Sequence, residues 1–96
     1  MLALAAALTT LAPPPLRADE HGRDEVRHAV DRGEIRSLAD VLAAIRGKLP
    51  GEIAGVEIER ENGRWLYEFR VIDDQGRLFE VYVDARTATI ERTKEK

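Results

Sequence analysis

The stretch VEIERENGRWLYEFRV, residues 56–71, decides the fold of this 96-residue chain. Apolar and polar residues alternate on both sides of Asn62-Gly63, the preferred two-residue turn of a β-hairpin. Because alternate side chains of a strand point to opposite faces, this turn determines which residues share a face. Glu61 pairs with Arg64, and one face then collects a continuous apolar set. Its members are Val56, Ile58, Trp65, Tyr67, Phe69 and Val71.

A third strand follows the loop 74–76, whose Gly76 suits the left-handed position of a three-residue hairpin loop. The resulting register places Val71 opposite Phe79 and extends the apolar face. The same register sets Arg70 opposite Glu80 on the other face, and only one of the two parities satisfies both conditions. Residues 88–92 predict a short edge strand. The sequence therefore predicts an antiparallel meander of three or four strands.

One amphipathic helix is available to cover the apolar face. Ser37 can cap its first turn, and the helix is expected to run until Pro50-Gly51. Its apolar stripe consists of Leu38, Val41, Leu42, Ile45 and Leu49. A shorter helix is expected over residues 24–32, ended by Gly33. The predicted fold is a two-layer α+β domain, with a short N-terminal helix and the main helix packed on the sheet.

The amino-terminal segment predicts export. Residues 2–12 carry no charge but fall short of the ~20 apolar residues of a membrane-spanning helix. Three prolines, residues 13–15, precede a candidate cleavage site after Ala18. We therefore expect a signal peptide over residues 1–18, a flexible leader over 19–23, a domain over 24–92 and a charged tail over 93–96. The alternative is a cytosolic protein with an Ala-rich extension, and the absence of cysteine fits either compartment.

Composition and motifs argue against several kinds of function. The formal net charge of −3 argues against general attraction to nucleic acid or anionic membranes. His21 and His28 are read as solvated side chains and not as metal ligands, and Ser37 as a helix cap and not a nucleophile. Glu57 and Glu68 face each other, but on an open, charged sheet face that would not separate their pKa values. No catalytic residue, cofactor site or metal site is predicted.

The reverse face of the sheet, opposite the apolar one, is the candidate protein interface. It mixes apolar and charged side chains, a composition common in protein contacts, and no element of the chain is left to cover it. The candidate interface residues are Leu66, Arg70, Ile72, Leu78, Glu80 and Tyr82. Scattered exposed apolar residues are also normal on protein surfaces, so the composition alone does not decide the matter. The sheet edges, residues 56–61 and the strand around Ile90, offer a second mode, addition of an extended peptide.

The chain from about residue 23 to residue 92 resembles the PepSY domain family. The resemblance lies in Gly33-Glu34-Ile35, the Leu-rich helix, the acidic strand, the aromatic strand around Trp65 and Tyr67, and Val83-Asp84-Ala85. The family commonly ends with Asp-Ala-x-Thr-Gly, and here Ala88 replaces the glycine. The resemblance implies an exported helix-plus-sheet domain without catalytic residues, of a kind found in metallopeptidase propeptides and as free-standing envelope proteins.

From these observations we expect a non-enzymatic, periplasmic or secreted protein-interaction domain without a stable membrane span. Its partner would be another protein, either a peptidase that it inhibits or regulates in trans or an envelope sensor. The alternative is a periplasmic module that binds a small ligand or a metal ion. The two differ in one observable property, because a ligand-binding module saturates with its ligand when no protein partner is present.

Overall fold

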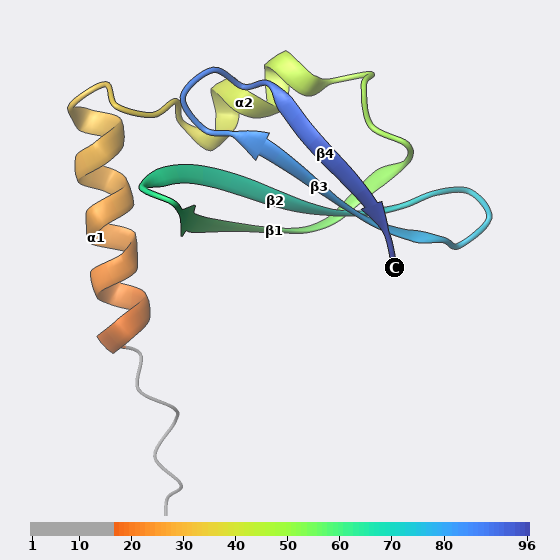
Figure 1. Cartoon of the computed structure of the whole chain (residues 1–96), viewed down its shortest axis with the longest axis horizontal. Coiled ribbons are helices and arrows are strands. Elements are labelled where there is room, and N and C mark those ends of the chain that lie inside the picture. The colour runs from red at the N-terminus through yellow and green to blue at the C-terminus, as the bar shows by residue number, and fades with distance from the viewer. Residues whose placement is uncertain (1–16) are drawn as a thin grey trace, which may run out of the picture.

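The computed structural model describes residues 17–96, with side chains described from residue 22 onward. Two helices precede four strands in the chain (Figure 1). The elements are α1 (Arg17–Asp31), α2 (Leu38–Ile45), β1 (Glu52–Glu61), β2 (Arg64–Ile72), β3 (Leu78–Asp84) and β4 (Ile90–Glu95). The strands form one antiparallel sheet in the order β1-β2-β3-β4. This is the α+β meander that the sequence predicts.

The predicted register is confirmed along both hairpins. Glu61 pairs with Arg64 and Val56 with Phe69, while Arg70 lies opposite Glu80. Asn62 and Gly63 both have positive φ, 53° and 79°, as a type I′ turn requires. The hairpin sequence therefore determines which side chains enter the core and which reach the reverse face.

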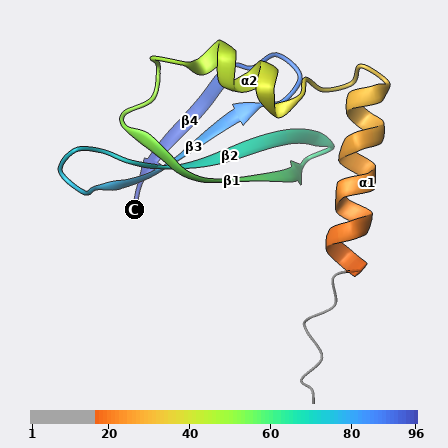
Figure 2. The ribbon, with the colours of Figure 1, turned by 180° about the vertical axis from the view of Figure 1, so that it is seen from behind.

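Helix α2 covers the apolar face of the sheet, which we call the core face (Figure 2). Val41 and Ile45 of α2 are fully buried there, together with Phe69 of β2. The loop before α2 is attached to the same face, because the Tyr67 hydroxyl donates a hydrogen bond to the Arg36 carbonyl oxygen at 2.9 Å. Ser37 caps α2 as predicted, accepting a hydrogen bond from the amide of Asp40 at 3.2 Å.

Both helices have bounds that differ from the predicted ones. Helix α2 ends at Ile45 and not near Pro50, because Gly47 adopts a left-handed φ of 81° that breaks the helical path. Helix α1 begins at Arg17, so residues 19–23 are helical in the structure where a flexible leader was expected. The predicted signal peptide lies almost wholly outside the described residues, and cleavage after Ala18 would remove only the first two residues of α1.

The turn before β4 is held by Asp84 and has Ala88 where a glycine was expected from the resemblance. The Asp84 carboxylate accepts hydrogen bonds from the amides of Arg86, at 2.8 Å, and Thr87, at 3.1 Å. Ala88 then takes the left-handed conformation, with a φ of 62°. Strand β4 continues to Glu95, so most of the expected charged tail, residues 93–96, belongs to the sheet. Charged side chains of β4 are thereby placed beside β3.

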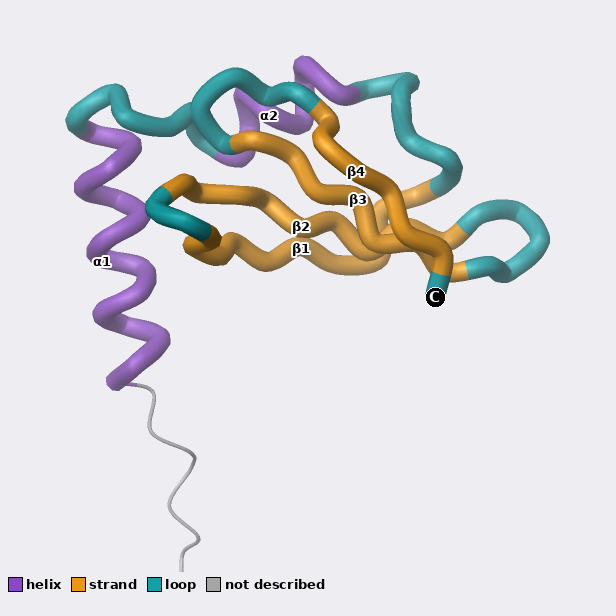
Figure 3. Tube along the Cα trace, in the orientation of Figure 1, coloured by secondary structure: helices purple, strands orange, loops and turns teal. Residues whose placement is uncertain are grey.

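Helix α1 lies beside the β1–β2 hairpin and runs across the strand direction (Figure 3). Ala29 is buried, and Val26 and Val30 pack against the core from its edge. Among the described residues, neither helix is long and apolar enough to span a membrane.

Candidate functional site on the reverse face

The reverse face carries the side chains that point away from α2. Register places Leu66, Glu68, Arg70 and Ile72 of β2 beside Leu78, Glu80 and Tyr82 of β3. Glu57, Glu59 and Glu61 of β1 flank this group on one side, and Arg92 and Lys94 of β4 flank it on the other. All six predicted interface residues therefore share one face.

Two of those six residues are not exposed. Leu66 has an exposed fraction of 0% and Tyr82 one of 7%. The Arg92 guanidinium lies over the Tyr82 ring, 4.0 Å from its centroid, and its Nη2 pairs with Glu61 at 3.2 Å. This ion pair links the first strand of the sheet to the last. In the strand register, the paired side chains pass over Leu66. Long side chains of the sheet itself therefore cover this end of the face without a further element.

The opposite end of the reverse face is open. Ile72 is 44% exposed, and it lies directly opposite half-buried Leu78. Arg70 is exposed next to this pair and bonds Glu57 at 2.5 Å. Lys96 pairs with Glu80 at 3.3 Å. An apolar pair bordered by ion pairs remains available for contact, and we call Arg70, Ile72, Leu78 and Glu80 the open patch.

Glu68 is the least exposed carboxylate of this face, with an exposed fraction of 8%. Burial raises its pKa, and the negative charges of Glu80 and Glu59 raise it further. Carboxylate oxygens of Glu57, Glu59 and Glu68 lie within 4.8 Å of one another, and hard cations bind such oxygens. Since Arg70 already pairs with Glu57, part of this charge is neutralised by the protein itself. The three glutamates form an acidic cluster whose charge is partly neutralised by Arg70.

Glu68→Gln is expected to stabilise the domain at neutral pH. A carboxyl with a pKa raised in the folded state favours folding while it is protonated, and this contribution is lost as the pH rises from the ordinary glutamate pKa of 4.5 through the folded pKa. The glutamine of the variant does not ionise. The variant should therefore be more stable than the native protein at pH 7.5 and equally stable at pH 4. Urea unfolding at pH 4 and pH 7.5 measures the difference.

Glu80→Gln is the matched control for this prediction, because it lies on the same face with the opposite shift. Burial of Glu80 opposes the shift, but hydrogen bonds from Lys96 and Tyr82 outweigh it and lower its pKa. Stability from Glu80 is present above the ordinary glutamate pKa of 4.5 and lost as the pH falls through the folded pKa, so this variant should be less stable than the native protein at pH 7.5. If both variants shift stability in the same direction at pH 7.5, the assigned environments are wrong.

The covering cations Arg92 and Lys94 were not among the predicted site residues. Both were assigned to an edge strand or a tail, where their partners could not be identified. A regular antiparallel register from the pair Val83–Ile90 would place Glu91 opposite Tyr82, but a shift at this point places Arg92 there instead. The sequence pattern therefore carried no signal for this contact. His28 is exposed on α1, away from this face, as a solvated histidine would be.

A small antiparallel sheet with one covering helix and an open, mixed patch defines a binding or regulatory module. A family model described as "PepSY: Peptidase propeptide and YPEB domain" matches residues 37–94, which include α2 and nearly all of the sheet. The chain belongs to the PepSY family. Helix α1 precedes the matched region. No match was found among curated proteins or among solved structures.

The family defines a coarse role. PepSY domains are generally non-catalytic modules, propeptide-like or regulatory, that mediate protein interactions and typically occur in exported proteins. A protein partner is compatible with this role.

Proposed function

We propose that this protein is an exported, non-enzymatic module that inhibits or regulates a peptidase in trans. The observation that carries the proposal is the match of residues 37–94 to a peptidase propeptide domain. A propeptide restrains its enzyme by surface contact, and the open patch supplies an apolar centre with a charged border for such contact. An envelope sensor is the other partner that this kind of surface would suit.

The charges of the reverse face support a binding role over a catalytic one. General acid–base catalysis needs carboxyls with well-separated pKa values inside a pocket that excludes water. Here Glu57, Glu61 and Glu80 are each engaged by a cation of another strand or of the chain end. These ion pairs fix the shape of the face, as a recognition surface requires.

Export of the protein is part of the proposal. An apolar segment at residues 2–12, prolines at 13–15 and Ala18 before the cut would make residues 1–18 a cleaved signal peptide. The mature protein would then act in the periplasm or outside the cell, where secreted peptidases are found. Mass spectrometry of the mature protein from an envelope fraction should give an amino terminus at Asp19, whereas an intact Met1 would contradict export by this route.

Ile72→Glu is expected to weaken inhibition of the target peptidase at least tenfold. The substitution places a charge at the centre of the open patch, and the 44% exposure of Ile72 lets the fold tolerate it. The assay mixes the purified domain with a panel of secreted metallopeptidases and measures residual peptide hydrolysis. Ile53→Glu is the matched control, because Ile53 is 40% exposed near the same end of the sheet but on the core face.

These measurements test the open patch as the interface separately from peptidase regulation as the function. Equal inhibition by Ile72→Glu and Ile53→Glu would remove the open patch from the interface. A native domain that inhibits no peptidase of the panel, and retains none from an envelope extract, would contradict the proposed regulation.

A further inference from the structure

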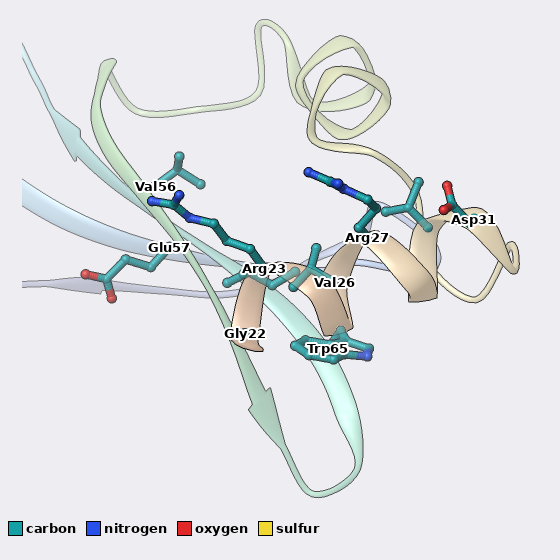
Figure 4. A pocket seen from close by; sticks show the side chains of 10 residues that line it. Gly22, Arg23, Val26, Arg27, Asp31, Val56, Glu57 and Trp65 are labelled. Carbon is teal, nitrogen blue, oxygen red and sulfur yellow. The ribbon is translucent and has the colours of Figure 1, made fainter. Parts of the chain in front are cut away.

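A hollow of about 860 Å³ lies between α1 and β1 (Figure 4). Its apolar lining comes from two elements that are far apart in the chain. Helix α1 contributes Val26 and Val30, and the hairpin contributes Val56, Ile58 and Trp65. Val56 is 38% exposed, so α2 leaves this end of the core face uncovered. The hollow thus exposes apolar surface that the domain itself does not use.

One border of the hollow is an unpaired strand edge. Strand β1 comes first in the sheet order, so it has a neighbour on one side only within residues 17–96. A two-residue turn closes on the hydrogen-bonded pair Glu61–Arg64, and hydrogen-bonded and non-hydrogen-bonded pairs alternate from there. Val56, Ile58 and Arg60 therefore direct their amide and carbonyl groups away from β2. The residues that line the hollow also offer free backbone donors and acceptors.

The rim of the hollow carries Arg23, Arg27 and Asp31 on its α1 side and Glu57, which is already paired with Arg70, on its β1 side. Arg23 and Arg27 are spaced i, i+4, so they share a face of α1, and both line the hollow. Figure 4 shows the two side chains extending from α1 in the same direction. Among the side chains described, from residue 22 onward, neither arginine is within ion-pair distance of a carboxylate. Two cations therefore border an apolar hollow beside an open strand edge.

We propose that this hollow binds an extended segment of the partner protein that carries an apolar side chain and, two residues along, a carboxylate. The segment adds to β1 as a fifth strand and bonds the free backbone groups of Val56, Ile58 and Arg60. Residues two apart in a strand share a face, so its apolar side chain enters the hollow while its carboxylate reaches Arg23 or Arg27. This inference rests on the proposed function, since it specifies the kind of segment that the partner presents.

The fluorescence of Trp65 can report binding of the segment in the hollow. Trp65 is the only tryptophan, it is half-buried, and it lines the hollow. Binding of an extended peptide should shift its emission to shorter wavelength, because the indole becomes less exposed to water. The probe is the capped peptide Ac-TLTETLTET-NH2, which presents leucine and glutamate two residues apart. Titration is followed by Trp65 emission and, independently, by calorimetry.

Reversing the charge of the rim should weaken this peptide at least tenfold. The variant is Arg23→Glu with Arg27→Glu, and a probe with lysine in place of glutamate should bind it more tightly than it binds the native protein. The matched control is Lys48→Glu with Arg86→Glu, which alters the net charge equally at exposed positions outside the hollow. Near-UV circular dichroism and the native Trp65 emission verify that the variants remain folded.

A second probe tests the strand edge separately from the charge. Replacing the central threonine by proline removes a backbone donor from the peptide and should abolish the emission shift. Equal binding of the glutamate and lysine probes to the native protein, or unchanged binding by the rim variant, would overturn the proposal. Absence of binding by the glutamate probe would overturn it as well.

The experiments distinguish a failure of peptide binding in the hollow from a failure of the proposed peptidase regulation. If the peptide does not bind but the domain still inhibits a peptidase, the hollow is not the docking site and the regulatory role stands. If the peptide binds but no peptidase is inhibited or retained, the hollow is a binding site of a domain with another role.

Discussion

Gly51→Ala is expected to destabilise the domain by about 3 kcal/mol, because the new methyl group has no room. A Cβ built on Gly51 would lie 2.7 Å from the Cα of Asp73 and closer still to the carbonyl oxygen of Ile72. These are backbone atoms, so no rotamer change can relieve the overlap. The strand entry into β1 or the end of β2 must move. A domain of this size is stable by about 4–12 kcal/mol, so the variant loses a large share of that free energy.

The matched control for this prediction is Gly55→Ala, four residues further along and within β1. A Cβ there meets only the guanidinium of Arg70, at 4.0 Å, which is an ordinary contact. Its effect on the free energy of unfolding should stay within about 0.5 kcal/mol. Urea unfolding followed by Trp65 emission compares the two variants with the native protein. If the two glycines tolerate alanine equally well, β1 does not approach β2 as closely as the structure shows.

Phe69→Ala is expected to destabilise the domain by about 3–5 kcal/mol. Phe69 is fully buried at the centre of the core face, and its ring lies 6.2 Å from that of Tyr67 between ring centroids. Removing it leaves a cavity beneath α2 that a small domain cannot fill by collapse. At the lower end of the stability range for this size, the variant would be unfolded at 37 °C.

Val56→Ala provides the comparison for Phe69→Ala, because Val56 is the partner of Phe69 across β1 and β2. Its side chain is 38% exposed, so truncation should cost less than about 1 kcal/mol. Circular dichroism during thermal unfolding gives both values. A loss from Val56→Ala as large as that from Phe69→Ala would mean that the end of β1 is more deeply packed than the structure shows.

The sheet could be predicted in detail because its signals are local. Asn62-Gly63 and Gly76 set the two hairpin loops, and an alternation of period two then assigns every side chain to a face. The pairing of Arg70 with Glu80 gave an independent check on that assignment. Ser37 was likewise sufficient to place the start of α2. In each case the deciding residue lies within a few positions of the structure that it determines.

The parts that could not be predicted depend on contacts between distant segments. Gly47 ends α2 four residues before the predicted stop at Gly51, although an apolar stripe continues to Leu49. The burial of Tyr82 depends on Arg92, which reaches it only once β4 is aligned with β3. The six candidate residues share one face, as the predicted register requires, but which of them are exposed could be determined only from the structure.

The meander order of the sheet also determines how the domain can assemble during synthesis. Each strand pairs with the one before it in the chain, so hairpins can close in sequence as the polypeptide emerges, and contacts of this local kind favour fast folding. Strand β4 comes last and carries Arg92 and Lys94, the two cations that lie over Tyr82. Without β4, the other three strands would leave Tyr82 without these two cations. The reverse face acquires its final shape only when the fourth strand joins.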